Sequence, residues 1–244
     1  MKRLVPYLAV AGALSLAFMG GILYDPQAEA ATGKRLFIVF LDETGGKDEA
    51  TQPWDEYVRY ASNLALRMGQ GDGIAVLGID DKAGHPSDSR IALEVLDPNP
   101  IAAIGQKRKI ANRIHELKVR NPGVKATDIL GIIHTASRLA ADLKGFQTQL
   151  VFFSDMVPYP AVPTAEDVRK SNISFAANSV AHMFFVNATS FQPHLGPKAT
   201  INDAQDTLKG IWETVLKAAG VRIETFVPKN GVPATFELLF PKPI

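Results

Sequence analysis

The sequence predicts a three-layer α/β domain with a doubly wound, mostly parallel sheet and helices on both of its faces. Two observations support this prediction. Continuous apolar runs alternate along the chain with longer segments in which apolar residues recur every three or four positions, as strands and helices do in βα units. The apolar runs also lack the polar alternation of half-exposed strands, which is typical of parallel strands that are buried on both faces.

The first half of the predicted domain contains three strands and two helices. Residues 36–41 form an apolar run and predict a buried strand. Residues 54–68 repeat apolar or aromatic side chains at helical spacing until glycines end the pattern, and residues 73–79 return to a continuous apolar run. A shorter strand is expected at 91–96, followed by an amphipathic helix at 100–120.

The second half continues the same alternation. Residues 127–143 predict a helix with a row of isoleucines on its buried side, and the apolar run at 149–153 predicts another buried strand. A strand at 182–187, an amphipathic helix at 203–219 and a strand at 221–227 follow. Because no internal repeat or low-complexity linker interrupts the pattern, we expect a single domain.

Two segments carry expectations of their own. Apolar residues alternate along 236–240 before Pro241, which predicts an edge strand at the end of the chain. The predicted helix at 100–120 has a basic face that could contact an acidic partner or lipid headgroups. Because no aromatic residues interleave with these charges to stack on bases, we interpret the face as a solvated helix surface.

The composition excludes several classes of protein and site. Lys and Arg number 26 against 25 Asp and Glu, so the net charge of +1 gives no field that would attract nucleic acid. The chain has no cysteine, which excludes disulfides, thiolate metal sites and a cysteine nucleophile. The five histidines show no paired metal-ligand spacing, so we interpret each as a surface or core residue.

The N-terminal segment resembles an export signal. The positive start Met1–Arg3 precedes an uncharged, mostly apolar stretch at 4–24, and Ala28–Ala30 gives the small-x-small pattern that signal peptidases read. The uncharged stretch is also long enough to remain as a membrane anchor. We therefore expect a signal peptide or signal anchor at 1–31 and a domain at 32–244 outside the cytoplasm, either periplasmic, in the cell envelope or secreted.

Oxygen-bearing side chains lie at the ends of predicted strands and at the start of a predicted helix. Asp42 and Asp155 each follow a predicted strand, and Thr127 opens a predicted helix. Ligands of open parallel sheets bind beyond the carboxyl ends of the strands, so these three side chains are expected to converge. Hard cations such as Mg²⁺ prefer oxygen ligands and retain several waters, which suits hydroxyls and water-bridged carboxylates.

Three short segments carry a resemblance to a known family. The segment 42–46 (Asp-Glu-Thr-Gly-Gly), the pair Thr127-Asp128 and the pair Ser154-Asp155 resemble the metal-ion-dependent adhesion site of the von Willebrand factor A family. The order of strands and helices from Arg35 to about Pro228 is similar as well. The resemblance implies a protein-interaction module that is not an enzyme.

The resemblance also implies roles for individual residues. Thr44 and Thr127 would bind a divalent cation such as Mg²⁺ directly, and Asp42 and Asp155 would hold it mainly through waters. Gly46 departs from the family pattern, because a second serine hydroxyl stands there in the family, so water or another group would have to fill that position. In the family, a carboxylate from a protein partner completes the shell of the ion.

Three functions remain open at this point. The first is an exported or membrane-anchored module that binds an unidentified protein partner at the top of the sheet, with membrane association through 1–31 if that segment is retained. The second is a phosphohydrolase resembling haloacid dehalogenases, although that family needs a second aspartate as acid and base where Thr44 stands. The third is a structural subunit of an envelope or secretion assembly without metal, in which Thr127 only caps its helix.

Overall fold

The structure is a computed structural model that describes residues 33–44, 53–80, 89–119, 127–159 and 161–242. The predicted export segment at 1–31 and Gly46 lie outside these stretches. The chain divides into two compact units, Met1–Gly33 and Lys34–Ile244. The second unit contains all of the strands and helices that follow.

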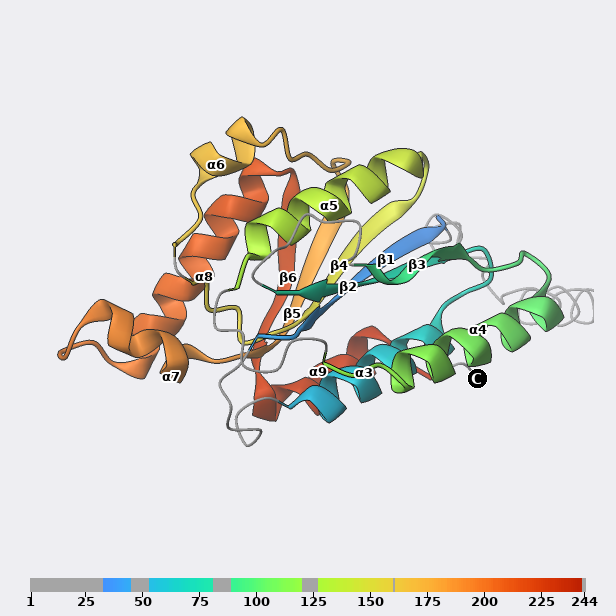
Figure 1. Ribbon diagram of the computed structural model, residues 1–244, viewed down its shortest axis with the longest axis horizontal. Coiled ribbons are helices and arrows are strands. Elements are labelled where there is room, and N and C mark those ends of the chain that lie inside the picture. Colours follow the sequence, from blue (N-terminus) through green and yellow to red (C-terminus); the bar gives the residue numbers. More distant parts are fainter. Residues whose placement is uncertain (1–32, 45–52, 81–88, 120–126, 160, 243–244) are drawn as a thin grey trace, which may run out of the picture. The chain divides into compact units, whose positions relative to one another are not determined.

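A six-stranded sheet in the order β3-β2-β1-β4-β5-β6 forms the centre of this unit (Figure 1). All neighbouring strands pair in parallel except β3, which is antiparallel to β2. From β1 the chain builds the sheet first toward β3 and then, from β4, toward β6. The topological switch point is therefore between β1 and β4. The strands are β1 (Arg35–Asp42), β2 (Gly73–Ile79), β3 (Ser89–Val95), β4 (Gln147–Phe153), β5 (Ser179–Val186) and β6 (Val221–Pro228).

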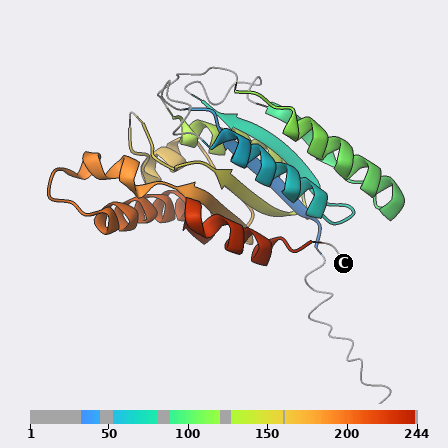
Figure 2. The ribbon, with the colours of Figure 1, turned by 90° about the horizontal axis from the view of Figure 1, so that it is seen from below.

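Helices cover both faces of the sheet, as the sequence predicts. One face carries α3, α4 and α9, and Figure 2 shows α3 lying between the other two. The opposite face carries α5, α6 and α8. Short turns, α7, η2 and η3, follow β5 and β6. The helices are α3 (Trp54–Arg67), α4 (Pro100–His115), α5 (Ile129–Asp142), α6 (Ala165–Lys170), α7 (Ala188–Phe191), η2 (Gln192–Leu195), α8 (Ile201–Ala218), η3 (Lys229–Gly231) and α9 (Val232–Leu239).

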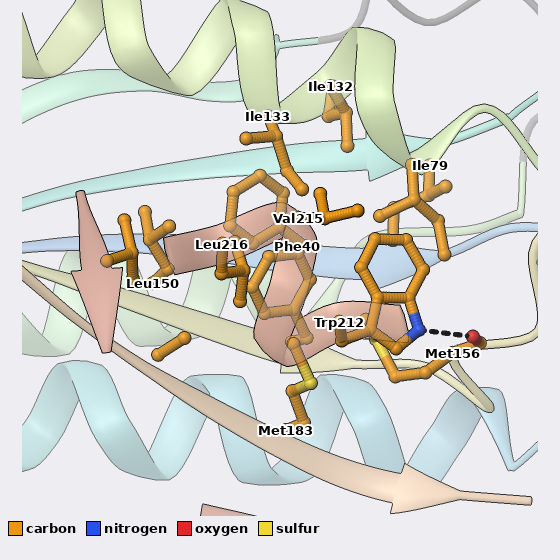
Figure 3. Packing of buried hydrophobic residues seen from close by; sticks show 14 of the residues in the cluster. Phe40, Ile79, Ile132, Ile133, Leu150, Met156, Met183, Trp212, Val215 and Leu216 are labelled. Carbon is orange, nitrogen blue, oxygen red and sulfur yellow. Dashed lines mark hydrogen bonds between the residues drawn. The ribbon is translucent and has the colours of Figure 1, made fainter. Parts of the chain in front are cut away.

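Strand β1 is buried on both faces and separates two apolar cores. Phe40 and its alternate neighbours pack under α5 and α8, whereas Val39 and its alternate neighbours pack under α3 and α4. The Phe40 ring stacks on Phe152 of β4 with 4.2 Å between ring centroids. Trp212 of α8 belongs to the same core, and its indole Nε1 donates a hydrogen bond to the Met156 carbonyl at 2.8 Å (Figure 3).

His182 of β5 is a buried core residue. Its ring nitrogens lie 2.9 Å from Gln149 Oε1 and 3.2 Å from Thr225 Oγ1. Burial lowers the pKa of His182 to about 4, because the charged imidazolium would lose its hydration. The side chain is therefore neutral near pH 7 and stabilises the packing of β4, β5 and β6.

The prediction of an edge strand at 236–240 is wrong, because this segment belongs to α9 and the turn that follows it. Val232, Phe236 and Phe240 recur every four residues and point into the core under α3, so helical spacing decides the structure. Pro233 stands in the first turn, where its missing amide proton costs no helical hydrogen bond. The basic helix α4 also ends at His115, earlier than the expected residue 120.

Candidate metal centre

Asp42 lies at the carboxyl end of β1, beside the switch point, and is only 3% exposed. Its Oδ1 accepts hydrogen bonds from the Thr44 amide at 2.9 Å and the Thr44 hydroxyl at 2.6 Å. Its Oδ2 accepts from the Ser154 hydroxyl at 2.6 Å. The bond to the Thr44 amide turns the chain immediately after β1, as Asp side chains commonly do. One carboxylate thus fixes hydroxyls from two different loops.

The two threonine hydroxyls of the predicted site face each other. Thr44 Oγ1 lies 2.8 Å from Thr127 Oγ1. Because Thr44 donates its single hydroxyl proton to Asp42, Thr127 must be the donor in this contact. A lone pair therefore remains on Thr44 and two remain on Thr127, so both oxygens are able to coordinate a cation.

Thr127 does not cap α5, which corrects the interpretation of this residue as the first of the helix. Asp128 is the N-cap, and its carboxylate accepts a hydrogen bond from the Gly131 amide at 2.8 Å. Thr127 instead forms an isolated β-bridge with Tyr159. Because the cap is supplied by its neighbour, the Thr127 hydroxyl is available to Thr44.

The loop after β4 brings in the remaining predicted ligand. Ser154 Oγ accepts a hydrogen bond from the Met156 amide at 2.9 Å, and Asp155 Oδ1 accepts one from the Val157 amide at 2.9 Å. Met156 has a φ of 61°, an uncommon backbone for a non-glycine residue that the Trp212 bond helps to hold. Within the described part of the chain, no hydrogen bond reaches Asp155 Oδ2.

Burial raises the pKa values of both carboxyl groups, and the charge of Asp42 adds to this effect at Asp155. The pKa of Asp155 is raised to about 7, first by burial and then by the negative charge of Asp42, against the opposing hydrogen bond from Val157. Burial likewise raises the pKa of Asp42, although the Ser154 and Thr44 hydrogen bonds oppose this effect. The repulsion that Asp42 exerts on Asp155 favours the presence of a compensating cation.

A cavity of about 940 Å³ adjoins these residues. Asp42, Thr44 and Asp155 form part of its wall. The remaining wall comes from α3, the end of β5 and the segment after β6, and it includes an ion pair between Lys229 and Glu56 at 2.6 Å. The site therefore opens into a space that a side chain of another molecule can enter.

The donor set suits a hard divalent cation. In the described stretches no three side chains from His, Cys, Asp and Glu cluster as a metal site, so a cage of that kind is not present there. The site offers hydroxyls and carboxylates instead, which Mg²⁺ accepts. Adjacent ligands in a Mg²⁺ octahedron lie about 2.9 Å apart. The 2.8 Å between the Thr44 and Thr127 oxygens matches this spacing.

Solved structures share this architecture. A von Willebrand factor type A protein from Catenulispora acidiphila matches with a TM-score of 0.51 and 11% identity over 85% of this chain and 42% of its own. The chain has the von Willebrand factor A fold. Pilus adhesin SpaC from Lactobacillus rhamnosus GG matches with a TM-score of 0.51 and 10% identity over 85% of this chain and 30% of its own. Proximal thread matrix protein 1 from the mussel byssus gives 0.50 and 11% over 85% and 47%.

These similarities concern the fold and not the function. The chain spans less than half the length of each of these three proteins, and the identities of 10–11% show the fold alone. No protein-family model and no curated protein matches the sequence. The roles of individual residues in this domain therefore depend on its own geometry.

The geometry brings together all of the predicted ligands at one edge of the sheet. Asp42, Thr44 and Thr127 form a continuous hydrogen-bonded chain, and Asp155 shares the cavity wall with the first two. Sequence reasoning missed the far wall of the cavity, which comes from helices and turns distant in sequence. No local pattern marks such residues. Sequence reasoning also missed that Ser154 orients Asp42, because this contact depends on the β1–β4 pairing.

Proposed function

We propose that the chain is an exported or membrane-anchored interaction module that binds a protein partner at the carboxyl edge of its sheet through a divalent cation. The observation that carries this proposal is the pair of threonine hydroxyls, 2.8 Å apart, beside Asp42 and the large cavity. Two proteins with this fold, a pilus adhesin and a thread matrix protein, have names that agree with a role in binding.

Each ligand has a distinct task in the proposed site. Thr44 and Thr127 would bind the ion directly, and Asp42 and Asp155 would hold it through waters. Ser154 keeps Asp42 oriented by donating to Oδ2. A bound divalent cation would supply an open coordination position for a carboxylate oxygen of the partner. The cavity then accommodates the partner residues around that carboxylate.

The export part of the proposal depends on the N-terminal segment. None of the described helices has the length and apolar character of a membrane span. The uncharged stretch at 4–24 lies outside the described residues, and its sequence supports either a signal peptide or an anchor.

The phosphohydrolase alternative has less support. It requires a general acid two residues after Asp42. Thr44 occupies that position, and its hydroxyl donates its proton in a hydrogen bond to Asp42. The metal-free structural subunit remains the alternative that an experiment has to separate from the proposal.

We expect the Thr44→Val variant to lose Mg²⁺ and Mn²⁺ affinity by at least about tenfold, because valine keeps the shape and removes a ligand. Isothermal titration of the chain that begins at Thr32 measures this loss. Thr214→Val on the exposed side of α8 is the matched control and should bind as the wild type does, and Thr44→Ser should retain binding. Equal heats for Thr44→Val and the wild type, or no heat from the wild type, would favour the metal-free subunit.

A further inference from the structure

The first turns of α4 expose apolar residues beside basic ones. Ile101 is 82% exposed and Ile104 is 50% exposed, and their spacing of three places both on one side of the helix. Leu66 at the end of α3 adjoins Ile104 in a hollow of about 450 Å³, which Lys107 and Arg108 also line. We call these five residues the α4 patch.

The α4 patch is not needed for the core of the domain. The helix packs on α3 through Ala103, Ile110 and Ile114, which are buried. Among the described residues, neither Lys107 nor Arg108 has an ion-pair partner, whereas Arg113 further along α4 is paired with Glu94. The patch therefore combines exposed apolar side chains with positive charge that has no ion-pair partner among the described residues.

The position of the α4 patch relates it to the N-terminal segment. Strand β1 and helix α4 begin at the same end of the sheet, and helix α3 ends there (Figure 1). The metal centre lies at the opposite end, where β1 stops at Asp42. The chain thus enters the domain at the edge that carries the patch. From Tyr24 to Lys34 it reaches at most about 35 Å, so a retained anchor would hold this edge near a bilayer.

We propose that the α4 patch docks onto a bilayer with anionic headgroups, an inference that rests on the proposed membrane anchor. Ile101 and Ile104 enter the boundary between headgroups and acyl chains, and Lys107 and Arg108 contact lipid phosphates. Interfacial helices combine apolar insertion with basic residues in this way. Docking by this edge directs the metal centre away from the membrane, where a protein partner can reach it.

The absence of cysteine makes the proposal directly testable, because one introduced cysteine is a unique labelling site. An environment-sensitive fluorophore is attached at Ile101→Cys in the full chain, reconstituted in phosphatidylcholine vesicles with or without phosphatidylglycerol. We expect a blue shift, and quenching by spin-labelled lipid, in the anionic vesicles. The control label at Ile201→Cys, an exposed isoleucine at the start of α8, should report water throughout.

A second measurement separates the α4 patch from the anchor. The chain that begins at Thr32 contains both cores and lacks the apolar segment. With added anionic vesicles, the double variant Lys107→Glu/Arg108→Glu should bind roughly thirtyfold more weakly than the parent chain, because each basic residue near an anionic surface contributes to binding.

The outcomes are distinct for the two proposals. If the full chain binds neutral vesicles no better than the shorter chain does, while the shorter chain gives the blue shift with anionic vesicles, the anchor is wrong and the patch is supported. A label at position 101 that reports water with anionic vesicles, in the full chain and in the shorter chain, overturns the docking proposal. Self-association of the shorter chain that Ile101→Glu abolishes, without any vesicle response, would assign the α4 patch to a second copy and also overturn it.

Discussion

The Asp155→Asn variant is expected to be more stable than the wild type at pH 8 without divalent cations, by roughly 2 kcal/mol. The folded-state pKa of Asp155 is raised to about 7, mainly by burial. Its contribution to stability is therefore complete below the ordinary pKa near 4 and is lost as the pH rises through 7. The full shift corresponds to about 4 kcal/mol, which we reduce because the carboxyl group borders the open cavity.

Urea unfolding in EDTA at pH 5 and pH 8 measures this effect. The wild type should lose stability between these pH values, and Asp155→Asn should lose much less. Asp206→Asn on the exposed side of α8 is the control and should follow the wild type. Added Mg²⁺ should stabilise the wild type and not Asp155→Asn. A variant that is less stable than the wild type at pH 8 in EDTA would show that the ionised carboxylate stabilises the empty site.

The Trp212→Ala variant is expected to reduce the free energy of unfolding by about 4 kcal/mol. Trp212 is fully buried between α8 and the sheet, so alanine leaves a cavity. It also removes the donor to the Met156 carbonyl, which immediately follows Asp155 (Figure 3). The loss of packing is therefore coupled to the loop that holds two of the site's polar side chains.

Trp212→Phe separates packing from hydrogen bonding. It keeps most of the apolar volume but leaves the buried carbonyl without its donor, at a cost of about 1–3 kcal/mol. Trp54→Phe is the matched control, because Trp54 is half-buried and its indole donates a longer bond of 3.3 Å to Leu117. Urea denaturation followed by circular dichroism compares them. Equal losses for the two phenylalanine variants would contradict a special role of the Met156 contact.

The fold was predictable because most of its strands are buried on both faces. The apolar run before Asp42 and the run before Ser154 each identify a strand, and the strand ends identify the ligand edge of the sheet. The segment 236–240 was misinterpreted because alternation over five residues is too short to separate a strand from a helix. The cap of α5 was misplaced by one residue because Thr127 and Asp128 are both good N-cap types.

The candidate site was only partly predictable. The ligand types could be taken from the sequence, because hydroxyl and carboxylate groups follow strand ends. The geometry could not, since it depends on the Thr44–Thr127 contact and on Ser154 donating to Asp42 from another strand. The exposure of Ile101 and Ile104 could not be predicted from the sequence either, because an amphipathic pattern does not tell which apolar residues remain outside the core.

The most direct test of the metal centre is anomalous diffraction from crystals of the domain grown with Mn²⁺. The proposal predicts an anomalous peak between Thr44 and Thr127, within direct coordination distance of both hydroxyl oxygens, with Asp42 and Asp155 in the outer shell. Crystals that bind no Mn²⁺ there, and in which the two hydroxyls keep their hydrogen bond at 2.8 Å, would contradict it.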